Sequence, residues 1–410
     1  MIKPKFKQTE TDKISKDWAM KKLGDIADFY NGKSSPKRNN LAQWPVFGSN
    51  GIIGYADECN SENGTIIIGR VGSYCGSLYY SEEKCWVTDN AIIGKTRKGT
   101  NCKFLFYLLM SLGLNRHRGG SGQPLLNQGI LNSIEIEIPD KLSIQCAIAK
   151  ILSDLDSKIE LNRQINKTLE SIAQAIFKRW FVDFEFPDEK GKPYKSSGGE
   201  IKNGIPREWA LRKLGDYVNV AKGCSYSSSD LQDSDKALVT LKSIERGGGF
   251  KKEGFKEYIG PYKPAQEIQD GDIVVAHTDL TQKAEVLGQP AIVHHVRKYT
   301  TLIASLDLSI VRSLNDELNN AFIYFLLKTD DFQNHALGYA NGTTVLHLST
   351  KAIPKYEFVL PQKNIVSKFG MIIQPILDKV KINSEETENI ILLRDSLLPR
   401  LMTGKIRVKV

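Results

Sequence analysis

The amino-acid sequence predicts an α+β protein: two tandem domains of mixed α/β structure, separated by two long helices that pack as an antiparallel coiled coil. The motif at Asp17–Asp25, DWAMKKLGD, returns at Glu208–Asp216 as EWALRKLGD. Short β-rich runs and glycine-rich turns follow each motif, and heptad spacing follows Pro139 and Pro361. An internal repeat of this length predicts one structural unit that is present twice.

The repeat continues through three later segments in the same order. The second copy is given in parentheses: a strand-like run at Gly64–Arg70 (Gly271–His277), a helix-like run at Phe104–Leu109 (Phe322–Leu327) and a closing strand at Ile134–Pro139 (Tyr356–Pro361). Ile134, Ile136 and Ile138 alternate with polar residues, which is typical of a strand with one face in water. Phe104–Leu112 is the helix expected within the first unit. Because the inserts between these segments differ, the two copies are expected to read different features.

After Pro139 the apolar period becomes seven residues, and about forty helical residues would span about 60 Å. The residues predicted to form the coiled coil and its partner interface are Ile148, Leu155, Asn162, Leu169 and Ile176 with Leu152, Ile159, Asn166, Ala173 and Trp180 in the first helix, and Phe369, Ile376, Asn383, Ile390 and Leu397 with Ile373, Val380, Thr387, Arg394 and Leu401 in the second. The alternative is that each amphipathic helix covers only its own domain.

Each seam contains an asparagine, and the second helix also contains two prolines. Asn162 and Asn383 fall at the third heptad of each, where a buried polar residue fixes register at a cost in stability. Pro375 and Pro399 are expected to kink or shorten the second helix, and Gly404 to end it.

These patterns divide the chain into five segments. They are a first domain at 1–139, a central helix at 140–186, a polar linker at 187–204, a second domain at 205–361 and a C-terminal helix at 362–410. The linker, PDEKGKPYKSSGGEIKNG, is rich in Gly, Ser and Lys and is the clearest boundary.

The composition favours a polyanionic partner. Lys and Arg total 56 against 47 Asp and Glu, which gives a net charge of +9 at pH 7 and a pI near 9.0. The first residues, MIKPKFKQTETDK, lack the apolar core of a secretory signal, and the longest apolar stretch, Phe104–Leu114, is too short for a bilayer. We therefore expect an intracellular protein. Six cysteines without a CxxC pair argue against a zinc site or a disulfide framework.

No catalytic motif is complete, so we expect a binding protein without catalytic or metal-binding residues. The chain lacks the Pro-Pro dipeptide of the loop that grips a base amine in DNA amino-methyltransferases. The leading glycine of a phosphate-binding loop is missing before both Gly32-Lys33-Ser34 and Gly94-Lys95-Thr96. A nuclease-like series, Pro139-Asp140 followed by Asp156-Ser157-Lys158, fits by spacing only. Asp156 and Lys158 fall on the predicted coiled coil, whereas such sites need converging strands.

Basic, glycine-rich loops recur at equivalent positions of both copies, a composition suited to phosphate contacts and base edges. The candidate DNA-binding residues of the first unit are Lys33, Lys37, Arg38, Arg70, Ser73, Tyr74, Arg116, Arg118 and Gln123. Those of the second unit are Lys222, Arg246, Lys251, Lys252, His277, Thr278, Lys283, Thr343, Thr344 and His347. For any single residue the alternative is a solvated surface charge.

Over nearly its whole length the chain resembles the specificity subunits of Type I restriction–modification systems. The resemblance rests on the W-x-x-x-x-L-G-D opening of each domain and the strand-Pro-helix exit at Pro139 and Pro361. The central stretch Lys158–Phe186 and the terminal Leu397–Ile406 are similar to the two helical regions of that family.

The resemblance implies a non-catalytic subunit whose two target-recognition domains each read one half of an asymmetric bipartite DNA target, with a spacer set by the helical pair. It also implies two adenine methyltransferase subunits on the helices, which flip out their target bases, and restriction/translocase subunits in the full complex. S-adenosylmethionine, ATP and Mg would then belong to those partners, in a prokaryotic cytoplasm.

Three other readings stay open. A self-sufficient DNA-modifying or DNA-cutting enzyme conflicts with the missing methyltransferase loop. An architectural coiled-coil scaffold would not bind duplex DNA in a salt-dependent manner. An orphan recognition subunit would keep the fold without an active partner complex.

Overall fold

The computed structural model describes residues 18–119, 125–279, 284–342 and 345–409. They form two compact units, one from the chain up to Asn162 together with Glu385 onwards, the other from Arg163–Ser384. Each unit contains one mixed α/β domain and part of both long helices. Among the described residues, no helix combines the length and apolar character needed to cross a membrane.

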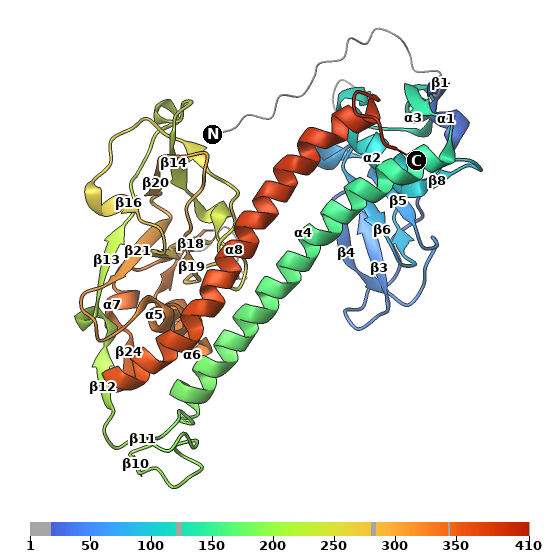
Figure 1. Ribbon diagram of the computed structural model, residues 1–410. Helices are drawn as coiled ribbons and strands as arrows, with labels where there is room; N and C mark the ends of the chain where they lie inside the picture. The colour runs from blue at the N-terminus through green and yellow to red at the C-terminus, as the bar shows by residue number, and fades with distance from the viewer. Residues whose placement is uncertain (1–17, 120–124, 280–283, 343–344, 410) are drawn as a thin grey trace. The chain divides into compact units, whose positions relative to one another are not determined.

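The first domain consists of two small sheets and a closing strand pair. Strand β1 (Trp18–Lys22) runs antiparallel to β9 (Glu135–Pro139), with Trp18 opposite Pro139. One sheet has the order β2-β8-β5-β6 (Ala27–Asn31, Ala91–Thr96, Thr65–Gly69, Leu78–Ser81), and the other the order β4-β3-β7 (Gly51–Ala56, Trp44–Gly48, Trp86–Val87). Helix α2 (Cys102–Leu112) shares its core with Ile66, Ile68 and Ile92 of the first sheet (Figure 1).

The second domain repeats this arrangement. Its closing pair is β12 (Ala210–Lys213) with β24 (Glu357–Leu360). Its sheets are β13-β21-β17-β19 (Val218–Lys222, Leu308–Ser313, Ile273–Ala276, Pro290–Ile292) and β15-β14-β20-β16 (Lys256–Glu257, Lys236–Val239, Thr301–Ala304, Glu267–Ile268), with helix α5 (Asn320–Leu327) in the place of α2. The sheet β18-β23-β22 (Thr278–Asp279, Leu346–Leu348, Ala340–Asn341) extends the bridges that Leu125 forms with Val71 and Gly119 in the first domain. Helix α7 (Ala352–Lys355) stands in the place of α3 (Gln128–Ser133), and helix α6 (Asp330–Gly338) is longer than the short turn Leu114–His117 that follows α2.

The two copies also share individual backbone hydrogen bonds. The N–H of Gly32 donates to the Ala91 carbonyl at 3.0 Å, and that of Gly223 donates to the Leu308 carbonyl at 2.9 Å. A Cβ atom on Gly32 or Gly223 would lie 2.1 or 2.0 Å from a backbone carbonyl oxygen, so only glycine fits at either position. The repeat seen in the sequence is therefore a repeat of the fold.

The two long helices are α4 (Leu142–Phe177, continued by a π-helical turn at Lys178–Val182) and α8 (Lys363–Met402). In the first unit, Arg394 donates to Asp156 at 2.8 Å. In the second, Asn383 donates to Asn166 at 2.9 Å. The residue numbers of the partners on α8 decrease as the residue numbers on α4 increase. The two helices (green and red in Figure 1) therefore pair antiparallel, as predicted.

Most residues predicted for the coiled-coil seam are buried or half-buried. Buried members are Ile148, Leu152, Ile159, Ala173, Trp180, Phe369, Ile373 and Leu401, and half-buried members are Leu155, Leu169, Ile176, Ile376, Val380, Ile390 and Leu397. Asn162 and Asn383 are both buried, and the Asn162 amide donates to Glu386 at 2.9 Å. The predicted polar layer is therefore present in the middle of the pair.

Of the two effects predicted for Pro375 and Pro399, the shortening of the second helix is wrong, because α8 runs unbroken through both to Met402, and the kink stays a prediction. Each proline removes the donor for the carbonyl four residues earlier, on Met371 or Asp395. These residues and both prolines lie on exposed positions, where water can satisfy the carbonyls. The positive φ of Gly404, 67°, ends the helix as predicted.

The segment 187–204 is more structured than its polar composition suggests. Tyr194 stacks on Phe186 with ring centroids 4.6 Å apart, and Phe186 stacks on Trp209 at 4.8 Å. Beyond this stack, β10 (Ile201–Lys202) pairs with β11 (Ile205–Pro206). Aromatic stacking holds the start of the connection against the second domain.

Replacing Phe177 with alanine is expected to destabilise the second unit by about 3–5 kcal/mol, because the change leaves a cavity in a packed core. Phe177 is 1% exposed, and its ring lies 5.0–6.3 Å from the rings of four other phenylalanines: Phe181, Phe322, Phe325 and Phe369. Urea denaturation measures the loss. Ile172→Ala, at a position 45% exposed on the same helix, is the control and should change stability far less. Equal losses in both variants would contradict this packing.

Candidate nucleic-acid interface

In the first domain, Arg70 follows β5, and two hydrogen bonds hold its backbone N–H and carbonyl groups in place. Its N–H donates to the Asn90 carbonyl and its own carbonyl accepts from the Leu126 N–H, both at 3.0 Å. Its guanidinium Nη1 donates to the Asp89 carbonyl at 3.3 Å. Arg70 is thereby held against the turn that precedes β8.

Other predicted basic loops meet the same turn. The Asp89 N–H donates to the Lys33 carbonyl at 2.8 Å, which brings Lys33 beside it. A Cβ on Gly76 would lie 2.5 Å from the Asn115 nitrogen, so the loop after Arg70 packs on the segment that carries Arg116 and Arg118. Lys33, Ser73, Tyr74, Arg116 and Arg118 are exposed. We call Lys33, Arg70, Arg116 and Arg118 the first basic cluster.

Two further candidates lie over the neighbouring sheet. Arg38 donates to the Ile53 carbonyl of β4 at 2.8 Å, while Lys37 is exposed. Gln123 lies outside the described residues.

His277 occupies the position of Arg70 in the second domain. Its N–H donates to the Asp307 carbonyl at 2.6 Å, and its carbonyl accepts from the Leu348 N–H at 2.8 Å. The following residues also correspond. Val71 pairs with Leu125 in the first copy, and Thr278 pairs with His347 in the second. The two domains therefore share one backbone arrangement, which we call the frame, and carry different side chains at equivalent positions of it.

The prediction that His277 and Thr278 are surface contacts is corrected by their burial. They are 4% and 5% exposed, so neither side chain reaches the surface. Burial, with Lys222 as a second cause, lowers the pKa of His277 to about 4. The ring is therefore neutral at pH 7.

The remaining candidates of the second domain lie at or near its surface. Lys222, Arg246 and His347 are exposed, and Lys251 and Lys252 are half-buried. Arg246 forms an ion pair with Glu285 at 3.3 Å, and the Nδ1 of His347 lies 3.5 Å from the Thr278 hydroxyl. Lys283, Thr343 and Thr344 lie outside the described residues.

Sequence reasoning missed three exposed asparagines beside these residues: Asn50, Asn90 and Asn341. Asn90 accepts the Arg70 N–H, and Asn341 pairs with His347 between β22 and β23. Their amides can read base edges. The one signal in the sequence was their place in turns next to the repeated strands.

Buried polar atoms without a protein partner recur at equivalent positions. Among the described residues they include Arg70 Nε and His277 Nε2, and the hydroxyls of Thr88 and Ser305. Thr88 and Ser305 supply the carbonyls that crowd Gly32 and Gly223. An unsatisfied buried polar atom costs free energy, so water or a bound group is expected to satisfy these atoms.

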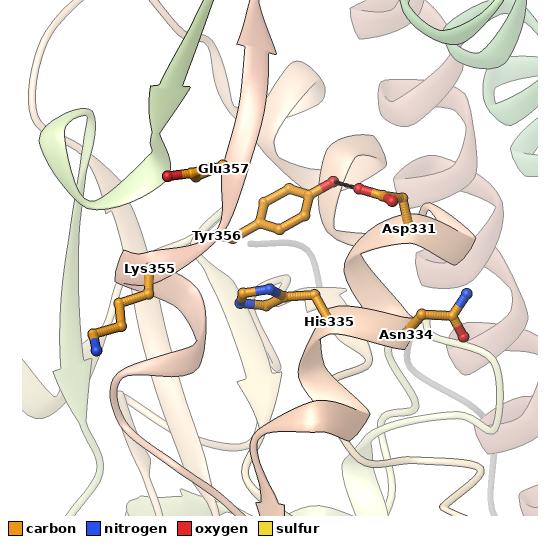
Figure 2. Close-up of a pocket in the computed structure, with 6 residues that line it drawn as sticks. All are labelled: Asp331, Asn334, His335, Lys355, Tyr356 and Glu357. Carbon is orange, nitrogen blue, oxygen red and sulfur yellow. Dashed lines mark hydrogen bonds between the residues drawn. The ribbon is translucent and has the colours of Figure 1, made fainter.

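A cavity of about 380 Å³ lies elsewhere on the second domain, lined by Asp331, Asn334, His335, Lys355, Tyr356 and Glu357 (Figure 2). Three of its polar side chains already have partners: Tyr356 donates to Asp331 at 2.6 Å, and His335 Nε2 lies 2.9 Å from the Ala352 carbonyl. Burial and Asp331 raise the pKa of Tyr356, so its hydroxyl stays protonated. This arrangement offers no activated nucleophile.

The nuclease-like series is likewise accounted for by structural contacts. Asp156 accepts from Tyr107 at 2.6 Å and from Arg394, and Lys158 forms an ion pair with Glu386 at 3.0 Å. Asp140 pairs with Lys21 at 2.7 Å. No group of three metal-ligating side chains occurs among the described residues.

The helices expose apolar side chains in matching pairs outside the seam. Aligned on Lys158 and Lys379, the pairs are Ile151 with Ile372, Leu161 with Ile382 and Ile172 with Leu393, with exposed fractions of 38 and 45%, 50 and 56%, and 45 and 48%. Exposed apolar side chains that recur on one element mark an interaction surface. The heptad pattern missed them because they fall between its positions, at spacings of ten or eleven residues.

The low pKa of His277 predicts acid sensitivity of the second unit. The unfolded imidazole binds a proton below about pH 6.5, whereas the folded one resists protonation until about pH 4. Stability is therefore complete above pH 6.5 and falls as the pH drops toward 4, by about 2 kcal/mol at pH 5. Urea midpoints at pH 7 and pH 5 measure the loss, and His277→Gln should reduce it. An unchanged pH dependence in that variant would contradict the assignment.

Comparisons with known proteins agree with this architecture. Residues 15–171 and 206–392 match the family model described as Type I restriction modification DNA specificity domain. The chain is 27% identical to the Type I restriction enzyme MjaIX specificity subunit of Methanocaldococcus jannaschii, over 98% of this chain and 97% of that one. It is 28% identical to the HindI specificity subunit of Haemophilus influenzae, over 74% and 77%. The crystal structure of an S subunit from M. genitalium is similar in fold, with a TM-score of 0.59 and 17% identity over 96% and 98% of the two chains.

Proposed function

This chain belongs to the Type I restriction–modification DNA specificity family, and we propose that its two domains read the two halves of an asymmetric, bipartite DNA target. The observation that carries the proposal is the shared frame with different side chains. At matching places the first copy has Arg70, Gly119 and Leu125, whereas the second has the buried His277 and the exposed Asn341 and His347. Two readers with one frame and different side chains recognise different sequences.

The proposed contacts divide into positioning and reading groups. Phosphate contacts, which supply affinity without sequence information, suit the net charge of +9 and three members of the first basic cluster: Lys33, Arg116 and Arg118. Arg70, Asn90 and, in the second domain, Asn341 and His347 are suited to base edges. Footprinting on the target should show two protected half-sites. One continuous footprint read by a single domain would argue against the proposal.

The helical pair supports a fixed spacer between the half-sites. Helix α4 has 36 residues and α8 has 40, and they pair along their length in antiparallel register. Inserting one heptad into both helices adds about 10 Å and keeps the packed faces aligned. The preferred spacer is expected to grow by about three base pairs at 3.4 Å each, with both half-sites unchanged. Altered half-sites or an unchanged spacer, in a selection from randomised DNA, would count against a helical ruler.

We propose that the exposed apolar pairs on α4 and α8 bind two adenine methyltransferase subunits. Two equivalent surfaces suit two copies of one partner. Methyl transfer and DNA cleavage would then reside in the methyltransferase and restriction/translocase subunits, with S-adenosylmethionine, ATP and Mg bound there. The purified chain alone should not methylate DNA when S-adenosylmethionine is supplied.

A further inference from the structure

The two places where a domain meets the long helices differ reciprocally. We call them the first joint, where α2 meets α4 and α8 in the first unit, and the second joint, where α5 meets them in the second unit. Asn101 and Asn319 cap α2 and α5 in the same way, which fixes the correspondence of the two helices. Lys158 and Lys379 fix that of α4 and α8.

The first joint contains a polar trio. The Tyr107 hydroxyl donates to Asp156 at 2.6 Å, and Arg394 donates to the other oxygen of Asp156 at 2.8 Å. Tyr107 is 2% exposed, and the Asp156 and Arg394 side chains are 32% and 22% exposed. The equivalent residues of the second joint are Phe325, Leu377 and Ala173, which all lie in one apolar core.

The second joint has its own ion pair at another level. Lys328 lies 3.2 Å from Glu170, and their side chains are 8% and 28% exposed. The Lys328 ammonium also donates to the Tyr324 hydroxyl at 3.4 Å. The equivalents of Lys328 and Glu170 in the first joint are Met110 and Ile391. Each joint is therefore charged where the other is apolar.

We propose that these two ion pairs make the halves of the chain complementary to each other and exclude pairing of either half with a second copy of itself. The repeat creates this hazard, because both halves present a domain and a helix of the same design. Non-equivalent charges at the joints distinguish correct pairing from pairing of like halves.

Pairing of like halves would leave charges of one sign without partners. Two copies of the first half would place Asp156 opposite Ala173 and Glu170 opposite Met110, which leaves two carboxylates unpaired at each joint. Two copies of the second half would place Arg394 against Phe325 and Leu377, where only Asp395 of its own helix, 2.8 Å away, would remain as its partner. They would also place Lys328 against Ile391, without the Glu170 carboxylate. A largely buried charge without its partner is strongly destabilising. Only the pairing of a first half with a second half forms both ion pairs, Asp156 with Arg394 and Glu170 with Lys328.

The test uses the intact chain with a protease site inserted after Gly198, an exposed position in the connection. The cleaved protein is unfolded in urea and refolded. Native mass spectrometry then counts the complexes of one first half with one second half (mixed pairs) and the complexes of two identical halves (like pairs). Mixed pairs are expected to exceed like pairs by roughly 100-fold or more, because each like pair leaves charges unpaired. The statistical ratio, two mixed pairs to one of each like pair, would overturn the proposal.

A variant of the same protein makes the residues that the first half contributes to both joints apolar. With Tyr107→Phe, Asp156→Leu and Glu170→Ile, like pairs of the first half should appear in quantity, and their continued absence would contradict the proposal. The uncleaved chain gives an independent readout. Asp156→Leu and Arg394→Leu should each lower the urea midpoint, and the double variant should recover part of the loss. Additive losses would show that the trio does not act as a matched pair.

Discussion

Replacing Leu161 and Ile382 with aspartate is expected to abolish adenine methylation in a host that carries the complete system, while the chain itself stays folded. These side chains are 50% and 56% exposed, so neither contributes much to the internal core. A charge in the centre of an apolar interface must be desolvated without a partner, which is costly. Loss of both equivalent surfaces removes both proposed methyltransferase contacts.

The matched control adds the same two charges at exposed polar positions of the same helices, with Thr168→Asp and Asn389→Asp. Both variants should show the urea midpoint of the parent protein. Size-exclusion chromatography with the methyltransferase subunit should show a complex for the control and none for Leu161→Asp with Ile382→Asp. A normal complex with the latter variant would place the partner surface elsewhere.

Replacing Arg70, Arg116 and Arg118 together with alanine is expected to weaken binding of the target DNA by at least about 100-fold. Arg116 and Arg118 are the proposed phosphate contacts, and loss of each should lower the slope of log K against log salt by about one, so the slope should fall by about two. Loss of Arg70 removes a proposed base contact. Arg116 and Arg118 are exposed, and the Arg70 Nε has no hydrogen-bond partner among the described residues, so removal of these groups breaks few internal contacts. Fluorescence anisotropy at several salt concentrations measures both quantities.

Lys95 and Lys98 provide the control for this experiment. Both are exposed: Lys95 lies in strand β8 and Lys98 follows it, at the end of the strand far from the Asp89 turn. Lys95→Ala with Lys98→Ala removes charge from the same domain and should leave affinity and salt slope nearly unchanged. Equal weakening by both variants would mean that net charge, and not the cluster at the end of β5, governs binding.

The elements with strong local signals were predictable from the sequence. Period-two and period-seven spacing gave the closing strand at Ile134–Pro139 and the two long helices, because those periods follow directly from backbone geometry. The seam asparagines, Asn162 and Asn383, could be placed inside the pair for the same reason. The prolines of α8 misled because propensity rules describe an isolated helix, whereas packing along 40 residues outweighs two lost hydrogen bonds.

What depends on long-range packing could not be read from the sequence. His277 resembles a loop residue by its neighbours, yet β23 covers it from a point about 70 residues later. Asp156 fitted a nuclease spacing, but its partner Arg394 lies 238 residues away. The reciprocal joints emerge only when equivalent positions of both copies are compared in three dimensions. Burial and pairing are properties of the folded chain, not of local spacing.

A map of modified bases in the host genome, made by long-read sequencing with and without this gene, tests the proposed function most directly. Loss of adenine methylation at a single split motif, with two different halves and a fixed spacer, is the predicted result. An unchanged map, or loss at one continuous motif, would contradict the assignment of one half-site to each domain.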